Sequence, residues 1–173
     1  MNVVQRGIPP GSALVRGESR FYYRDAFEAR LSRTELSITE IYLAIFTHHP
    51  WWAKLALVAR AKVVSVFGLK GTALADLNDV EIKKAYAVGE KIAGRFTLFW
   101  QDENEIIAGR NDKHLDFRVS VLRMTECGVN KVVLSTVVNP HNFFGKAYLF
   151  LILPFHKLGV RAILSNSVNA NWV

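Results

Sequence analysis

The chain has 173 residues, of which half are apolar, and a formal net charge of +7 at pH 7. This length and apolar content predict one globular domain with a substantial core and exclude a disordered chain. The basic residues are dispersed along the chain, and their longest uninterrupted run is the pair Lys83-Lys84. A nucleic-acid-binding surface usually clusters its basic residues, so the sequence predicts no nucleic-acid partner.

The single cysteine, Cys127, excludes an internal disulfide and a cysteine-based zinc site. The N-terminal residues contain no continuous apolar run of signal-peptide length. The most apolar stretch, residues 147–155, is nine residues long, well short of the roughly 20 that cross a bilayer. We therefore expect a cytoplasmic protein without a stable membrane span.

Residues 1–18 show no usable periodicity and contain a Pro-Pro-Gly break, which predicts an extended N-terminal arm. Residues 19–173 are predicted to form a single domain. Its first strand is predicted over residues 20–31, where aromatic and apolar side chains alternate with charged ones.

Two consecutive helices are predicted next. Ser37 and Glu40 have the spacing of a capping box, which begins a short helix that ends near His48. Pro50 fits the first turn of a second helix, which ends where Gly68 supplies the left-handed terminating position.

An antiparallel meander is predicted in the second half of the chain. Residues 71–84 carry few large apolar side chains and are interpreted as an irregular connection. Alternation with period two then returns in four segments separated by short polar links, an order that favours antiparallel neighbours. The four predicted strands are residues 95–100, 105–109, 115–123 and 131–138.

A long closing helix is predicted after these strands. Asn139 and Pro140 supply a helix cap and a first-turn proline, and apolar residues follow at three- and four-residue spacing to Ala162. Pro154 is expected to kink this helix near residues 150–151. Because its middle is apolar nearly all round, it should lie between the sheet and another helix, a bound apolar ligand or a second subunit. The sequence leaves these three open.

The main candidate site lies where apolar alternation coincides with ionisable side chains. A carboxylate beside an imidazole can tune it for general acid or base catalysis, so His114 and Asp116 are candidate proton-transfer groups. Arg118 can hold an anionic group of a ligand. In the alternative interpretation, the polar residues at alternating positions of this strand simply form its solvated face. An Asp116–Arg118 ion pair on that face would contribute little to stability. The polar residues that share the parity are Asp112, His114, Asp116, Arg118 and Ser120.

Several large apolar side chains are predicted either to line a ligand cavity or to pack as core. The five histidines include no pair at helical i, i+4 spacing, so no metal site is predicted. The lack of a phosphate loop and of a glycine-rich dinucleotide motif predicts no cofactor. The candidate lining residues are Trp52, Trp100, Tyr148, Leu151 and Phe155.

Segments 52–70, 111–118, 141–148 and 154–156 carry a resemblance to a known family. With them the chain resembles the bacterial family called domain of unknown function 2867, and it departs from the family pattern at Arg60-Ala61, where Arg-Asn is expected. The order of predicted elements resembles the helix-grip fold of the START-like (SRPBCC) superfamily. That resemblance implies an α+β domain with two early helices, in which a curved antiparallel sheet grips the C-terminal helix around a ligand cavity.

Three functions are compatible with this sequence. The first is binding of a small apolar or amphipathic molecule between the sheet and the closing helix, with His114, Asp116 and Arg118 at the polar end of the site. The second is an enzyme of polyketide-cyclase or isomerase type that uses His114 and Asp116 as acid and base. The third is an interaction module that forms a homodimer, or docks on an anionic membrane, through the closing helix.

Overall fold

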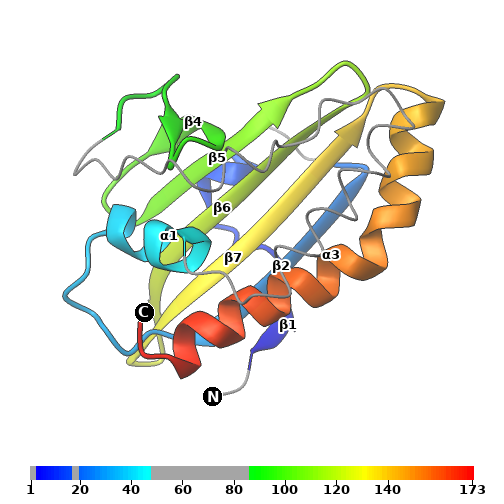
Figure 1. Cartoon of the computed structure of the whole chain (residues 1–173). Helices are drawn as coiled ribbons and strands as arrows, with labels where there is room; N and C mark the ends of the chain where they lie inside the picture. Colours follow the sequence, from blue (N-terminus) through cyan, green and yellow to red (C-terminus); the bar gives the residue numbers. More distant parts are fainter. Residues whose placement is uncertain (1–2, 17–19, 48–85) are drawn as a thin grey trace.

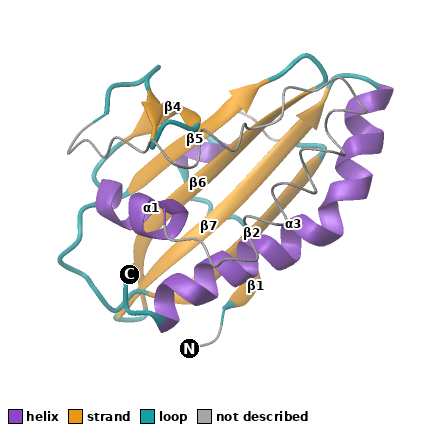
Figure 2. Ribbon diagram, in the orientation of Figure 1, coloured by secondary structure: helices purple, strands orange, loops and turns teal. Residues whose placement is uncertain are grey.

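The computed structural model describes residues 3–16, 20–47 and 86–173. Within this part of the chain, seven strands form one antiparallel sheet, with the α-helices on one face and the N-terminal segment on the other (Figure 1, Figure 2). The strand order in the sheet is β1-β2-β7-β6-β5-β4-β3. The strands are β1 (Val4–Arg6), β2 (Tyr23–Arg30), β3 (Lys91–Ile92), β4 (Phe96–Gln101), β5 (Glu105–Asn111), β6 (Leu115–Glu126) and β7 (Val129–Pro140). The helices are η1 (Ala13–Val15, a 3-10 helix), α1 (Ile38–Thr47) and α3 (Phe143–Asn169).

The predicted meander is confirmed, because β4, β5, β6 and β7 pair with one another in sequence order. The predicted first strand is β2, which pairs with the other edge of β7 from Tyr23 opposite Val138 to Arg30 opposite Lys131. An α+β fold with an antiparallel sheet and a long C-terminal helix is therefore confirmed.

The predicted capping box starts α1. The Ser37 backbone amide donates to Glu40 Oε2 at 2.8 Å, and the Glu40 amide donates to Ser37 Oγ at 3.3 Å. The buried face of α1 then presents Ile41 and Ile45 to the core beneath the sheet. The second predicted helix, from Pro50 to Gly68, and the connection at 71–84 lie outside the described residues.

The predicted start of the closing helix was wrong. Asn139 and Pro140 complete β7, where they pair with Asp116 and Leu115 of β6, so the strand continues past the expected cap. The cap of α3 is instead Asn142, whose side chain accepts a hydrogen bond from the Gly145 amide at 3.0 Å. Pro154, which was expected to kink the closing helix, lies inside α3. The course of α3 is bent in Figure 1.

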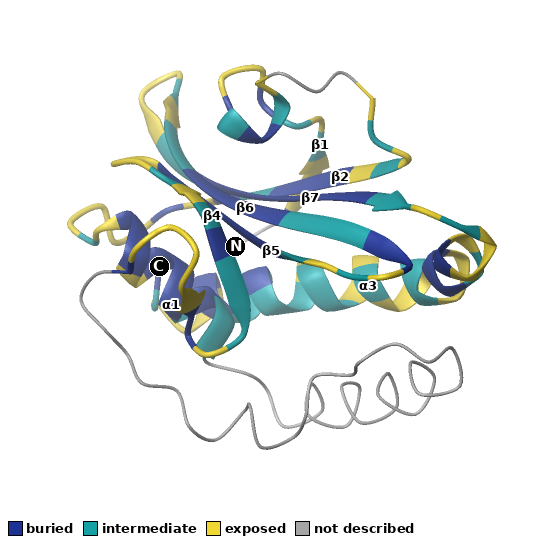
Figure 3. Ribbon diagram, turned by 90° about the horizontal axis from the view of Figure 1, so that it is seen from above, coloured by how far each residue is buried: buried dark blue, intermediate teal, exposed yellow. Residues whose placement is uncertain are grey.

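Side chains of β6 alternate between two packed faces. Val119 and Val121 join the main core together with residues of α1 and of the C-terminal part of α3. Leu122 packs on the opposite face with Ala26 and Val133. Figure 3 shows α1 and α3 on one side of the sheet and the N-terminal segment with η1 on the other. Both faces are therefore covered, which explains why several polar positions of the sheet are buried.

The N-terminal arm is attached to the sheet at two places. Its strand β1 pairs with β2, with Val4 opposite Glu28. Leu14 of η1 packs against Ile107 and Val137 on the face opposite α3. The segment expected to be extended thus contains a strand and a turn of helix, both of which contact the domain.

Of the described helices, α3 is long and apolar enough to cross a membrane, judged by length and composition alone. Its most apolar window has a mean hydropathy of 1.5 and is 17% buried in the structure. The same helix packs against the sheet through Tyr148, Leu149, Leu164 and Val168.

Candidate functional site

The buried carboxylate of Asp25 marks the strongest candidate site, on the face of the sheet that α3 covers. Phe27 and Ala29, at the same parity of β2, join the main core, so the alternation of the strand directs Asp25 toward that face as well. Its side chain is only 1% exposed. A carboxylate in such a place needs hydrogen-bond or charge partners, because burial without them is costly.

Two side chains contact Asp25 Oδ2. The Tyr23 hydroxyl donates a hydrogen bond to it at 2.6 Å. His156 Nε2, from α3, lies 3.3 Å from the same oxygen, and the His156 ring meets the Tyr23 ring edge-on with centroids 6.1 Å apart. Together with Thr136, which faces Asp25 across the β2–β7 ladder, these residues form what we call the Asp25 cluster.

Two oxygens of the Asp25 cluster are buried and make no hydrogen bond with the described residues, namely Asp25 Oδ1 and Thr136 Oγ1. Thr136 is 3% exposed and directly opposite Asp25 in the sheet register, so the two groups share one face. His156 Nε2 also lacks an aligned hydrogen bond, despite its contact with Oδ2. Because buried polar groups are almost always satisfied, this concentration points to a site that binds something.

Burial favours the protonated form of the Tyr23 phenol. It raises the pKa of Tyr23 well above the ordinary value of 10, and the hydrogen bond to Asp25 and the charge of Asp25 raise this pKa further. The phenol therefore remains a proton donor at neutral pH and holds Oδ2 in place. His156 is 24% exposed in its side chain, so it links the buried carboxylate to solvent. Such a group can accept a hydrogen bond from a ligand or move a proton.

An apolar patch borders the Asp25 cluster along the first half of α3. Tyr23 packs against a buried set of residues from the start of β6, the adjacent end of β7 and α3. A molecule with one polar end and an apolar body would match the carboxylate and this patch respectively. The buried members of the patch are Leu115, Val138, Tyr148 and Leu149.

His114 links the β5–β6 loop to the start of α3 through hydrogen bonds. The His114 carbonyl accepts a hydrogen bond from the His141 amide at 2.8 Å. His114 Nδ1 lies 3.0 Å from Asn142 Nδ2 and 3.1 Å from Asn142 Oδ1, and the tautomer of the imidazole determines which of these two atoms is its hydrogen-bond partner. His114 is 7% exposed, and its ring lies edge-on to Phe144. This imidazole therefore contacts the helix cap, and not the carboxylate that the sequence suggested.

Asp116 and Arg118 lie away from the α3 face. Asp116 Oδ2 lies 3.2 Å from His141 Nε2. The Arg118 guanidinium stands 3.7 Å from the centroid of the Phe99 ring, which packs with the N-terminal arm on the opposite face. Its Nη2 also donates to Asn111 Oδ1 at 2.6 Å. The sheet thus separates Arg118 from the Asp25 cluster.

The predicted lining residues do not converge on one site. Tyr148 is buried in the apolar patch beside the Asp25 cluster. Leu151 and Phe155 are 49% and 70% exposed on the outer side of α3, and Trp100 is 42% exposed on β4. Trp52 lies outside the described residues.

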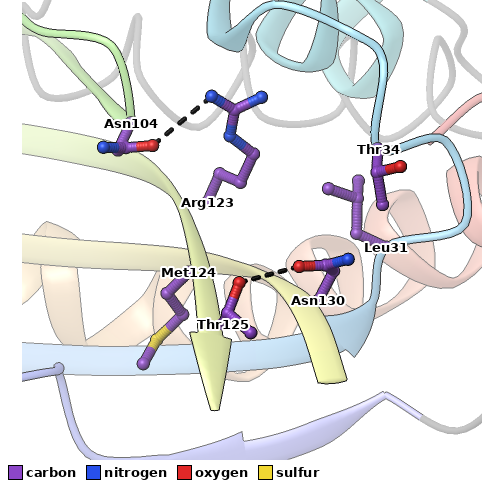
Figure 4. Close-up of a pocket in the computed structure, with 7 residues that line it drawn as sticks. All are labelled: Leu31, Thr34, Asn104, Arg123, Met124, Thr125 and Asn130. Carbon is purple, nitrogen blue, oxygen red and sulfur yellow. Dashed lines mark hydrogen bonds between the residues drawn. The ribbon is translucent and has the colours of Figure 1, made fainter. Parts of the chain in front are cut away.

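A hollow of about 390 Å³ lies at the far end of β6 (Figure 4). Arg123 crosses it and donates from Nη1 to the Leu36 carbonyl at 2.9 Å and from Nη2 to the Glu103 carbonyl at 3.1 Å. Thr125 Oγ1 donates to Asn130 Oδ1 at 2.7 Å. Since these groups bind one another and the surrounding loops, the hollow offers a ligand less than the Asp25 cluster does.

The sequence interpretation did not select Asp25, although a signal was present. Asp25 occupies an odd-numbered position in a strand whose other odd-numbered positions are aromatic or apolar. A charged residue at such a position is directed into the core. Its partner His156 could not be found in the same way, because 131 positions separate the two residues and only the fold brings α3 to β2.

Comparison with known proteins gives one match. No curated protein and no solved structure matches the sequence. A family model described as "Protein of unknown function (DUF2867)" matches residues 18–163, a range that includes every residue of the Asp25 cluster. The chain therefore belongs to the DUF2867 family of proteins of unknown function.

Proposed function

We propose that this protein binds a small amphipathic molecule between the sheet and α3, with the Asp25 cluster at the polar end of the site. The observation that carries the proposal is the pair of buried oxygens, Asp25 Oδ1 and Thr136 Oγ1, which share one face and make no hydrogen bond with the described residues. A ligand hydroxyl can donate to the carboxylate and accept from the threonine, which satisfies both groups at once.

The charge of the site narrows the class of ligand. Asp25 supplies a carboxylate acceptor, and the protonated Tyr23 adds no charge of its own. A ligand that carries a hydroxyl, amide or amine donor is favoured, whereas a carboxylate or phosphate at this position would meet like charge. The apolar patch around Tyr148 and Leu149 would hold the body of the molecule.

The proposal includes a START-like helix-grip arrangement, in which the sheet and its C-terminal helix enclose the ligand. Support comes from the antiparallel sheet, from the packing of α3 against β2 and β7, and from the polar groups buried between them. On this fold the Asp25 cluster takes the place that the sequence interpretation gave to His114, Asp116 and Arg118.

A second candidate function is an acid–base enzyme of isomerase or cyclase type. The contact between His156 Nε2 and Asp25 Oδ2 favours it, because a carboxylate stabilises the imidazolium that forms when histidine takes a proton from a substrate. In this function His156 would be the base, and Asp25 would be a positioning residue that stabilises its charge.

The binding function is tested by native mass spectrometry of the freshly purified full chain, followed by identification of any small molecule released on denaturation. The expected result is a stoichiometric adduct that is lost in Asp25→Asn and weakened in Thr136→Val. Ser135→Ala is the matched control, because Ser135 Oγ is also buried without a described hydrogen-bond partner but lies at the opposite parity of β7. An adduct that persists in Asp25→Asn would overturn the assignment of this site.

To distinguish an enzyme from a binding protein, the protein is incubated in D₂O with the molecule that mass spectrometry identified. Exchange of a carbon-bound hydrogen for deuterium, lost in His156→Gln while the adduct is retained, would establish proton transfer. Retention of the adduct without any exchange in the wild-type protein would exclude proton abstraction from that molecule and leave binding as the function.

A further inference from the structure

The outer side of α3 carries a row of exposed apolar side chains, and it lies opposite the side that packs on the sheet. At 100° per residue these side chains occupy one sector of the helix, and Phe150 and Phe155 lie at its two edges. Isolated exposed apolar residues are ordinary, but a contiguous row of large ones marks a contact surface. The row consists of Phe143 (77% exposed), Phe144 (55%), Phe150 (77%), Leu151 (49%), Phe155 (70%) and Leu158 (70%).

Basic side chains run along one edge of the apolar row. Lys146, Lys157 and Arg161 are all exposed, and their spacings of eleven and four residues place them on the same side of the helix. The 27 residues of α3 include no aspartate or glutamate. An apolar sector with a purely cationic edge is typical of helices that lie in the surface of an anionic membrane.

The charges argue against a second copy of the chain as the partner. A symmetric contact through the apolar row with the two α3 helices antiparallel would bring their cationic edges together, and α3 itself supplies no carboxylate to pair with them. An anionic lipid surface offers both the apolar layer and the opposite charge. The formal net charge of +7 adds attraction to the same surface.

The packing of α3 on the sheet indicates whether this helix would span a bilayer or lie flat in its surface. Tyr148, Leu149, Leu164 and Val168 are buried against the domain. A helix that spanned the bilayer would have to remove these side chains from the core, whereas a helix lying flat in the interface keeps them. We infer that α3 docks this protein on anionic membrane surfaces through the row from Phe143 to Leu158, with Lys146, Lys157 and Arg161 facing the lipid phosphates.

The test is co-sedimentation of the full chain with vesicles of phosphatidylcholine alone and with vesicles that also contain phosphatidylserine. The expected result is binding to the anionic vesicles that weakens as salt is raised. The triple variant Lys146→Gln, Lys157→Gln, Arg161→Gln should bind on the order of 100-fold more weakly. The matched control replaces three exposed bases elsewhere, Arg24→Gln, Arg30→Gln, Lys91→Gln, lowers the formal charge equally, and should bind nearly as well as the wild type.

The apolar contribution is tested with Phe150→Ser, Phe155→Ser, which leaves the charge unchanged and should reduce binding roughly tenfold or more. Circular dichroism confirms that each variant is folded. Equal loss in the base-substituted control, or no binding of the wild type to anionic vesicles, would overturn the inference. A concentration-dependent dimer in the absence of vesicles that the phenylalanine variant abolishes would also overturn it, in favour of a second copy. Protein that resists release by 1 M salt and by alkaline carbonate would indicate insertion in place of surface docking.

Discussion

Gly145 lies directly against the backbone carbonyl of His114, so a Cβ atom built at position 145 would stand 2.1 Å from that oxygen. This close approach brings the first turn of α3 onto the β5–β6 loop. The same region holds the hydrogen bond between the Asn142 side-chain amide and His114 Nδ1. Helix and sheet are therefore joined here through backbone that only glycine allows to come so close.

Gly145→Ala should destabilise the protein by about 1–3 kcal/mol, because the new methyl group meets a carbonyl held in the sheet and cannot be absorbed by a side-chain movement. Equilibrium unfolding in urea measures the change. Gly159→Ala is the control in the same helix, since an added Cβ there has no neighbour within 4 Å. It should be neutral or stabilising by up to about 1 kcal/mol. Equal losses in both variants would contradict the proposed steric cause.

Glu105→Gln should loosen the N-terminal arm. The buried Glu105 carboxylate, 2% exposed, accepts hydrogen bonds from Ser12 Oγ at 2.5 Å, from the Ala13 amide at 2.6 Å and from Ser120 Oγ. An amide in its place turns one acceptor into a donor that faces other donors, at a cost of about 2–3 kcal/mol. Urea unfolding should show this loss, and limited proteolysis should cut near residue 16 sooner than in the wild type. Glu103→Gln, at an exposed position nearby, should change neither measurement.

Tyr23 should titrate well above its ordinary pKa of 10. A pKa that folding raises means that the folded state holds the phenol proton more tightly than the unfolded state. Its contribution to stability is complete below about pH 10 and is lost as the pH rises through the folded-state value. The difference between the ultraviolet titration curves of the wild type and Tyr23→Phe isolates this phenol. A difference curve centred at or below pH 10 would contradict the described burial and hydrogen bond.

Glu126 should contribute to loss of stability in acid. A hydrogen bond from Lys131, 2.6 Å away, lowers the pKa of Glu126 most, and Arg6 lowers it further. Because this pKa is lower in the folded state, the contribution is present above the unfolded value of about 4.5 and is lost as the pH falls through the folded value. Melting temperatures from about pH 6 to about pH 3 should therefore fall less steeply in Glu126→Gln than in the wild type. Parallel curves for the two proteins would exclude a measurable contribution from these contacts.

The sequence by itself determined the local structure of the described regions. Alternation over residues 20–31 and over the later segments predicted the strands that pair in the sheet, because the period of a half-buried strand is visible within one segment. The spacing of Ser37 and Glu40 likewise predicted the start of α1, since both partners of a capping box lie within four residues. One exception was the start of α3, where pairing with β6 extended β7 through Pro140. Another was the N-terminal arm, which contains β1 and η1.

Only the tertiary structure decided which polar groups meet. His114 and Asp116 are neighbours in the sequence, but the fold pairs the first with Asn142 and the second with His141. Asp25 and His156 are distant in the sequence and come into contact only because α3 packs across β2. Strand periodicity specifies which side chains share a face, but it does not specify which helix covers that face. The helix that covers the face determines whether a carboxylate on it is solvated or contacts a buried partner.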